Sequence, residues 1–407
     1  MRKLRLTAAL GTLTVALLAP FATAAPASVL AGPTAINARQ FSLTTDMTGL
    51  ASKVTALETA LTGRRKTVDQ VMQAANRPRG ALCNASAYKP ATDRWGSAVG
   101  GFCWNDGDDA ADHWYPQGIT TTRDALAAGQ YDNHQLIANS WYHKPENDTA
   151  GSPNKGVRLS LTDWDADFAN NYRHLLLVEP IAGGNYKAVP IHAGGIFWYG
   201  DLLYVADTGT GFRIFDFRKI YSADTGKANA IGKQSDGTFH AHDYAYVMLQ
   251  TGWVRNAGAA LRYSFVSLDR ATTPDSMVMG EWTPDSSGTS RIVRFPLDYT
   301  DRLPAQEADG KTYGSEAYST GFLSMQGVAA RDGRFWFSSS AGSGGPTGNY
   351  GTLRIWNRGS TTVTSYGWIY GAEDLSYWSD PANPDSIWSL TEYPNYRAVI
   401  SVPSGLN

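Results

Sequence analysis

The stretch IHAGGIFWYGDLLYVADTGTGFRIFDF, residues 191–217, contains three short apolar runs separated by glycine-containing turns. His192 and three small residues precede the first run, and Gly200-Asp201 separates it from the second. Runs of this length that are rich in aromatic and β-branched residues and bounded by Gly and Asp are typical of strands. The stretch therefore predicts three consecutive strands joined by tight turns.

The same order of elements recurs along the chain. Residues 325–357 repeat it with Gln326-Gly327 at the start, residues 370–403 repeat it with Glu373-Asp374, and an earlier unit begins at Gln117-Gly118. A further unit with longer loops is expected to begin at HAHD, residues 240–243. A unit of strand, turn, strand, turn and strand that returns at intervals of roughly 45 to 85 residues is typical of a β-propeller.

We therefore predict an all-β chain that forms a β-propeller with five blades, with six blades as the alternative. A large two-sheet β-sandwich would also explain the strands, but it would not explain the repeated order of small residues, strand, glycine turn and strand.

The N-terminus is typical of a secretory signal peptide. The basic segment MRKLR precedes an apolar run, and ATA and APA offer small residues for cleavage near Ala24 or Ala27. We assign residues 1–27 to this signal. No later stretch reaches about 18 uninterrupted apolar residues, so we expect a secreted, extracellular protein with no membrane span in the mature chain.

We divide the mature chain into an N-terminal extension, residues 28–110, and a propeller domain, residues 111–407. Within the extension, apolar residues at three- and four-residue spacing predict a helix, or two short ones on either side of Gly63. These residues are Leu50, Val54, Leu57, Leu61, Val68, Val71 and Met72. The two cysteines of the chain, Cys83 and Cys103, predict one disulfide in an oxidising compartment.

Composition excludes one class of partner. The chain has 407 residues, 18% of them charged, and a formal net charge of −2. This balance does not suit a protein that binds nucleic acid, which needs an excess of basic residues. We expect a monomer whose partner is an extracellular glycan or a small molecule.

The residues that precede the first strand of each unit are candidates for a binding site. In a propeller these strands surround a central channel, so residues far apart in sequence meet at one mouth. The polar residues at these positions are Gln117, His192, the 240–243 stretch, Gln326 and the Glu373-Asp374 pair. We expect them to form a polar ring, with Gly118, Gly194, Gly195 and Gly327 letting the backbones approach closely. The plainer alternative is that each polar side chain only satisfies backbone groups at the start of a strand.

Two clusters suggest a divalent metal as the cofactor. His240 and His242 are two residues apart, so on a strand both point to one face, and with Asp243 they form a candidate site for Zn, Mn or Ni. The acidic run WNDGDDAADHW, residues 104–114, is a candidate Ca²⁺ loop. It departs from the EF-hand order, and ordinary loops are the simpler interpretation of both clusters.

Two enzyme classes fit the predicted mouth. A glycoside hydrolase needs two carboxylates, for which the candidates are Asp243, Glu373, Asp374 and Glu392. A polysaccharide lyase needs a base, His192 or His242, and a cation such as Arg173, Arg213 or a metal beside the uronate carboxylate. The histidines favour the lyase.

Ligand binding at the mouth is assigned to side chains that stack on a sugar or hydrogen-bond to it. These are Gln117, Gln326, Trp198, Tyr199 and Arg213. A non-catalytic propeller that binds a glycan or a protein would use the same residues without an acid–base pair, and it is the alternative function. An adhesion protein that binds through its N-terminal helix is a third.

The repeated units also resemble a group of secreted actinobacterial proteins that have a propeller-like fold and no assigned reaction. The stretches that carry the resemblance are residues 192–208, 211–217, 261–270, 325–338, 371–378 and 387–394. The resemblance extends over most of residues 100–405. It implies a fold and an export route, and it implies no catalytic residue.

Overall fold

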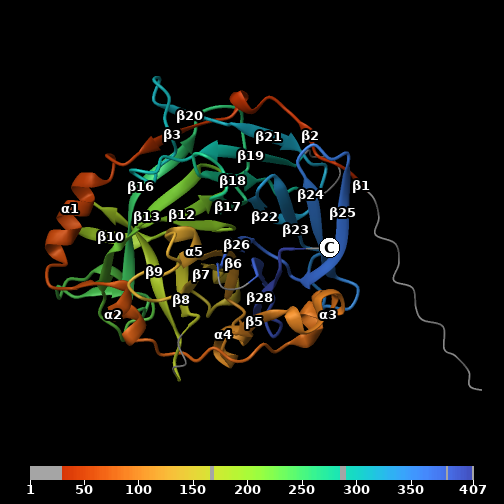
Figure 1. The fold of residues 1–407 in the computed structure, drawn as a ribbon. Helices are drawn as coiled ribbons and strands as arrows, with labels where there is room; N and C mark the ends of the chain where they lie inside the picture. Colours follow the sequence, from red (N-terminus) through yellow and green to blue (C-terminus); the bar gives the residue numbers. More distant parts are fainter. Residues whose placement is uncertain (1–29, 166–168, 285–289, 382–383, 406–407) are drawn as a thin grey trace, which may run out of the picture.

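The structure, a computed structural model, describes residues 30–165, 169–284, 290–381 and 384–405. The predicted signal peptide lies outside these residues. The described chain is mostly β, and its strands are arranged around a common centre (Figure 1).

Most strands belong to antiparallel units in which neighbours in sequence pair with each other. The first unit contains β6 (Trp114–Thr121), β7 (Leu136–His143), β8 (Val157–Asp163) and β9 (Tyr172–Ile181), with β10 (Asn185–Ala188) at its edge. The second contains β11 (Ile196–Tyr199), β12 (Leu202–Asp207), β13 (Gly211–Ser222) and β16 (Tyr246–Asn256). Their outer strands, β9 and β16, pair in parallel and join the two units into one large sheet.

The next two units are separate sheets. One contains β17 (Phe265–Asp269), β18 (Ser276–Gly280), β19 (Arg291–Pro296) and β21 (Glu316–Ser319). The other contains β22 (Met325–Arg331), β23 (Arg334–Ser339), β24 (Tyr350–Asn357) and β25 (Thr362–Tyr370). The last unit contains β26 (Ser376–Trp378), β27 (Ser386–Leu390) and β28 (Ala398–Pro403), and its outer strand is β5 (Gly100–Cys103) from the N-terminal part of the chain.

The first strands of the units contact one another in the order β6, β11, β17, β22, β26 and back to β6. Glycines allow this close approach, as the sequence predicts. A Cβ atom on Gly118 of β6 would lie 2.9 Å from the Ile196 nitrogen of β11. A Cβ atom on Gly195 would lie 2.5 Å from the Val266 nitrogen of β17. A closed ring of sheets with their first strands innermost is a β-propeller-like fold, which confirms the predicted class at that level.

The predicted start of one unit is wrong. HAHD, residues 240–243, does not precede an inner strand, because β16, which follows it, is the outer strand of the preceding unit. Residues 239–241 form β15, which pairs with β14 (Ile231–Lys233) in a separate hairpin. The inner strand of the next unit is β17, and the residues that precede it are Arg262 to Ser264. The long β13–β16 connection hides this order in the sequence.

The N-terminal segment runs around the periphery of the molecule (red to orange in Figure 1). Its short strands pair with outer edges: β1 (Leu30–Ala31) with β25, β2 (Thr34–Ala35) with β21, β3 (Ser42–Asp46) with β16 and β20 (Lys311–Tyr313), and β4 (Arg65–Lys66) with β13. The segment that the sequence separates as an extension therefore supplies strands to the sheets, including β5 of the last unit.

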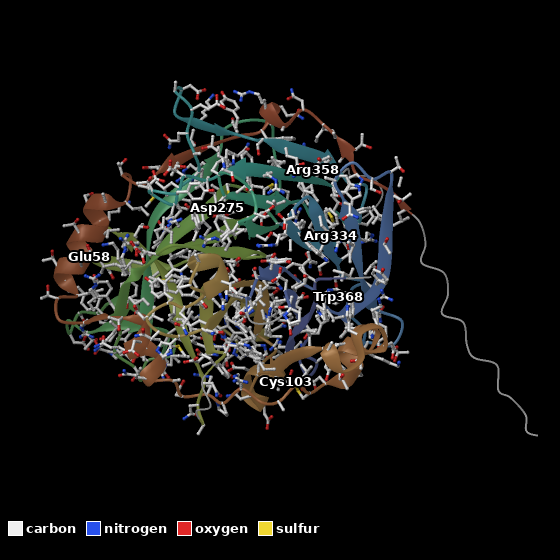
Figure 2. All side chains as sticks on the ribbon, viewed as in Figure 1. Glu58, Cys103, Asp275, Arg334, Arg358 and Trp368 are labelled. Carbon is white, nitrogen blue, oxygen red and sulfur yellow. A yellow bond between two sulfur atoms is a disulfide. The ribbon has the colours of Figure 1, made fainter. Side chains whose placement is uncertain are left out.

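The predicted helical segment forms two helices, α1 (Ala51–Ala60) and α2 (Val68–Gln73), and its apolar residues are buried against the sheets. Figure 2 shows Glu58 of α1 at the outer edge, where it accepts hydrogen bonds from Lys219 and Tyr221. The remaining helices are α3 (Lys89–Trp95), α4 (Asp106–Ala110) and α5 (Thr122–Ala125), with 3-10 turns at 38–40, 85–88, 96–98 and 145–147.

The predicted disulfide between Cys83 and Cys103 is confirmed, with Cα atoms 5.8 Å apart. Figure 2 shows Cys103, the last residue of β5, at the rim of the molecule. Among the described residues, no helix is both long and apolar enough to cross a membrane.

Candidate functional site

A pocket of about 220 Å³ lies where the inner strands begin, and we call it the mouth pocket. Its lining residues come from several sheet units: His192, Thr208, Arg262, Ser264, Trp282, Gln326 and Glu392. His192 precedes β11, Arg262 and Ser264 precede β17, and Gln326 starts β22. The structure therefore brings together two of the predicted strand-start residues, His192 and Gln326, in one cavity.

Two carboxyl groups meet beneath the mouth pocket. Glu373 is buried, whereas Glu392 is partly exposed to the pocket, and the two carboxyl groups share a hydrogen bond. Gln326 donates to Glu373 at 3.0 Å, and Gln117 donates to Glu392 at 3.0 Å. Four side chains from three units thus form one continuous chain of hydrogen bonds.

This carboxyl pair holds a proton at neutral pH. Burial, and then the charge of Glu392, raise the pKa of Glu373 well above its usual range. Burial also raises the pKa of Glu392, although Arg397 and Gln117 oppose the increase. Two carboxylates in contact cannot both ionise without strong repulsion, so the pair shares a proton.

Asp374 lies deeper, between the inner strands. Its Oδ2 atom accepts hydrogen bonds from the backbone nitrogens of Ile119 and Ile196, at 3.3 and 3.2 Å. Its Oδ1 atom is buried and has no partner among the described residues. Because the residue is fully buried, its pKa is raised well above the usual value. Asp374 therefore connects β6 and β11 to the start of β26 and does not face the mouth pocket.

His192 is poised as a neutral base in the pocket wall. Its ring packs on Tyr142, with centroids 4.6 Å apart, and its exposed side faces the pocket. Burial of the rest of the ring, and then the charge of Arg262, lower the pKa of His192 to about 4. The imidazole is therefore uncharged at pH 7, and its nitrogens make no hydrogen bond within the described residues.

Arg262 supplies the positive charge of the pocket. Its guanidinium lies over the Trp282 ring, 5.0 Å from the centroid, and its side chain makes no ion pair within the described residues. The neighbouring carboxylate, Glu281, is instead paired with Arg291 at 2.6 Å. The mouth pocket thus offers an anionic ligand a cation, an indole and a neutral imidazole.

Three of the predicted ligand-binding residues are engaged elsewhere. Trp198 is buried and stacks on Phe217, with centroids 3.7 Å apart. Tyr199 is buried and donates to Asp275 at 2.9 Å. Arg213 is paired with Glu179 and Asp207, each at 2.9 Å. None of the three lines the mouth pocket, because Trp198 and Tyr199 of the inner strand β11 pack between sheets and Arg213 lies on β13, the third strand of its unit.

The predicted metal ligands do not form a cluster. His240 is buried in the β14–β15 hairpin, and His242 and Asp243 occupy the turn that follows, where Asp243 accepts a hydrogen bond from the Gly226 nitrogen. Burial lowers the pKa of His242 to about 4. Within the described residues no group of three or more His, Cys, Asp and Glu side chains is arranged to hold a metal ion. His242 and Asp243 line a separate pocket with His113 and Trp114, at the start of β6, and not the mouth pocket, so we propose no catalytic role for them.

The acidic run at 104–114 is not a simple solvated loop. Asp108 is buried and accepts hydrogen bonds from Tyr172 at 2.6 Å, from Arg158 at 2.9 Å and from His174 at 3.0 Å. His174 also contacts Ser160 at 2.8 Å. Ser160 is fully buried and unavailable to a substrate. The network joins α4 to β8 and β9, and its role is therefore structural.

The sequence analysis missed Arg262, Ser264, Thr208 and Trp282. Arg262 and Ser264 would have been found if LRYSFVSLD had been aligned as the start of a unit, since they occupy the position that His192 occupies before β11. Trp282 follows β18 in a loop, and no periodic pattern marks it.

No protein family matches this sequence, and no curated protein is similar to it. Among solved structures, a chain described as a glucose dehydrogenase is similar over 71% of this chain and 84% of its own, with 10% sequence identity and a TM-score of 0.29. At this level of similarity no function or residue role is transferred.

Proposed function

We propose that this protein is an exported propeller with five blades, and that its mouth pocket binds an acidic sugar of an extracellular glycan and cleaves the glycan by β-elimination. The observation that carries this proposal is the content of the mouth pocket. It combines an arginine that makes no ion pair within the described residues, a histidine that is neutral at pH 7, and a carboxyl group that shares a proton.

The ring of inner strands supports the blade number. β6, β11, β17, β22 and β26 each start a unit and contact the next in a closed order. The disulfide supports export, because disulfides persist in oxidising compartments and are rare in the cytosol.

The reaction requires three groups. A base removes the proton on the carbon next to the uronate carboxylate, the bond from the adjacent carbon to the glycosidic oxygen breaks, and that oxygen takes up a proton. His192 is the candidate base, since a neutral imidazole accepts a proton. Arg262 stabilises the negative charge that develops on the carboxylate. Glu392 lines the pocket and is the candidate proton donor, because it shares a proton with Glu373.

A hydrolase is less well supported. Retaining and inverting glycosidases need carboxyl groups about 5 Å or more apart, on either side of the scissile bond. Glu373 and Glu392 are in hydrogen-bond contact, and Glu373 does not line the pocket. Asp243 and Asp374 do not line the mouth pocket, so the four predicted carboxylates do not form such a pair there.

Non-catalytic binding of an acidic sugar is the second candidate. The volume of the mouth pocket favours it, because about 220 Å³ is below the roughly 300 Å³ at which pockets for drug-sized ligands begin. A cavity of this size accommodates a single sugar ring. It suits either a binding protein or an enzyme that acts at a chain end.

A turnover assay with matched variants tests the proposal. Wild-type protein is incubated with uronate-containing and neutral polysaccharides, and the ultraviolet absorbance of the unsaturated product is followed. We expect product from a uronate polymer only. His192→Asn should lower kcat by a factor of 100 or more, because a positioned base contributes about 10²- to 10⁴-fold. His113→Asn, at a histidine outside the mouth pocket, is the control and should leave kcat unchanged.

Each outcome decides between the candidates. Binding of the uronate polymer without any product would replace the lyase with the binding protein. Product from His192→Asn at the wild-type rate would remove His192 as the base, and an absence of both binding and product would refute the proposal as a whole.

A further inference from the structure

A second pocket, of about 180 Å³, lies at the opposite end of the inner strands. Its walls include residues at or just beyond the ends of β6, β17, β22 and β26, whereas the mouth pocket is formed where such strands begin. We call it the arginine pocket, because Arg123, Arg270 and Arg331 line it. It lies outside the site proposed above and shares no residue with the mouth pocket.

The three guanidinium groups are only loosely neutralised. Arg123 lies 3.5 Å from Asp380, Arg270 lies 3.7 Å from Asp275, and Arg331 lies 3.7 Å from Asp332. The charge-assisted hydrogen bonds of arginine are normally about 2.7–2.9 Å long. The side chains of the three arginines are only 12%, 23% and 28% exposed, so water screens their mutual repulsion incompletely.

Several other arginines of this protein with little exposure are paired tightly. Arg294 contacts Asp269 at 2.7 Å and Glu316 at 2.8 Å. Arg158 contacts Asp108 at 2.9 Å, and Arg213 contacts two carboxylates at 2.9 Å. The arginine pocket gathers three partly buried cations whose nearest carboxylates lie 3.5–3.7 Å away, farther than in these pairs.

Aromatic rings position these guanidinium groups and leave N–H donors available. Arg331 lies over Tyr377 at 5.0 Å, Arg270 over Tyr199 at 5.7 Å and Arg123 over Trp378 at 5.8 Å, measured to the ring centroids. Stacking on an aromatic face holds a guanidinium without using its N–H groups. The Arg123 Nε atom is buried and has no hydrogen-bond partner within the described chain.

The side chain of Asp124, in the pocket wall, hydrogen-bonds to hydroxyl groups and not to the arginines. The Oδ2 atom of Asp124 accepts hydrogen bonds from Thr120 at 2.8 Å and from Ser376 at 2.9 Å, so it is directed into the protein. Burial also raises the pKa of Asp124 to about 6. Arg270 contacts this residue only through the backbone oxygen, at 2.8 Å.

We propose that the arginine pocket is an anion site that binds a tetrahedral dianion, either inorganic sulfate or phosphate or the same group carried by a small molecule. Guanidinium groups suit this ligand, because their planar N–H forks donate pairs of hydrogen bonds to such oxyanions. A dianion would also supply a directly hydrogen-bonded counter-charge, which the carboxylates 3.5–3.7 Å away do not.

Calorimetric titration of the whole protein tests the proposal. Sodium sulfate, sodium phosphate and glucose 6-phosphate are titrated separately into wild-type protein at constant ionic strength set with chloride. Arg331→Gln is the test variant, because the Arg331 side chain is the most exposed of the three. We expect Arg331→Gln to weaken binding of the preferred dianion at least tenfold. Arg334→Gln, at the labelled arginine of β23 outside the pocket (Figure 2), is the control and should bind as the wild type does.

Further comparisons distinguish a free ion from a group carried by a small molecule, and a loss of binding from a folding defect. Tighter binding of glucose 6-phosphate than of inorganic phosphate would assign a carried group, and the reverse would assign a free ion.

Without added dianion, Arg331→Gln should melt at the wild-type temperature or higher, since the variant removes repulsion between the arginines. A folding defect would appear as a lower melting temperature. Equal weakening by Arg331→Gln and Arg334→Gln, or no binding beyond that of chloride, would overturn the proposal. Turnover or binding at the mouth pocket should be the same in both variants.

Discussion

At the residue scale, the interior of the ring of sheets contains three buried carboxyl groups. Asp124, Glu373 and Asp374 are buried, and burial raises the pKa of all three. A buried carboxyl group is tolerated when it is neutral or well hydrogen-bonded. These residues therefore make the free energy of unfolding fall as the pH rises, whereas a salt-bridged aspartate makes it increase.

We expect Asp374→Asn to stabilise the protein at neutral and higher pH and to have little effect near pH 4. The pKa of Asp374 is higher in the folded than in the unfolded protein, so the folded state binds more protons between these two values. Wild-type stability consequently falls as the pH rises through that window, by about 1.4 kcal/mol for each unit of pKa difference. Asparagine does not titrate and avoids this loss.

The measurement is urea unfolding of wild type and Asp374→Asn from pH 4 to pH 8. Asp332→Asn is the control, because Asp332 is 75% exposed and also has a positive φ of 50°, which asparagine tolerates. A difference between wild type and Asp374→Asn that stays constant with pH would show that Asp374 does not carry the raised pKa.

At the element scale, β5 closes the ring. It comes from the N-terminal part of the chain and pairs with β28, the last strand, and the disulfide holds its end. Gly101 lies at the centre of this contact. It has a φ of 132°, and a Cβ atom there would lie 1.9 Å from the Val399 oxygen.

We expect Gly101→Ala to lower the free energy of unfolding by about 2–5 kcal/mol. Strain at a position that favours glycine costs about 1–3 kcal/mol, and overpacking costs a similar amount. Gly209→Ala, in an exposed turn with no atom within 4 Å of the added carbon, should change stability by less than about 0.5 kcal/mol. Equal stability of the two variants in chemical denaturation would contradict the pairing of β5 with β28.

At the scale of the whole molecule, the sequence predicted the class of fold because the repeat is local. Small residues, an apolar strand and a glycine turn follow one another within about 30 residues, so Gln117, His192, Gln326 and Glu373 could be aligned before their positions were known. The glycines beside them were predicted to allow close approach, and the spacing of the inner strands confirms it.

Long connections explain what the sequence could not predict. β16 lies more than twenty residues beyond β13 yet belongs to the same unit, so HAHD was mistaken for the start of the next unit and Arg262 was missed. Which face of a strand becomes buried also depends on neighbouring sheets. Trp198 and Tyr199 therefore looked like sugar platforms in the sequence, although they pack in the core.

The most direct test of the central claim is a calorimetric titration of the mouth pocket with a matched pair of ligands. A uronate oligosaccharide and its carboxyl-reduced neutral counterpart are titrated into His192→Asn, in which turnover of the ligand is slowed, and into His192→Asn combined with Arg262→Gln. We expect the acidic ligand to bind at least tenfold more tightly than the neutral one, because a hydrogen bond to a charged group contributes about 1.5–3 kcal/mol. We expect Arg262→Gln to abolish this preference. Equal affinity for the two ligands, or a preference that survives Arg262→Gln, would contradict the central claim.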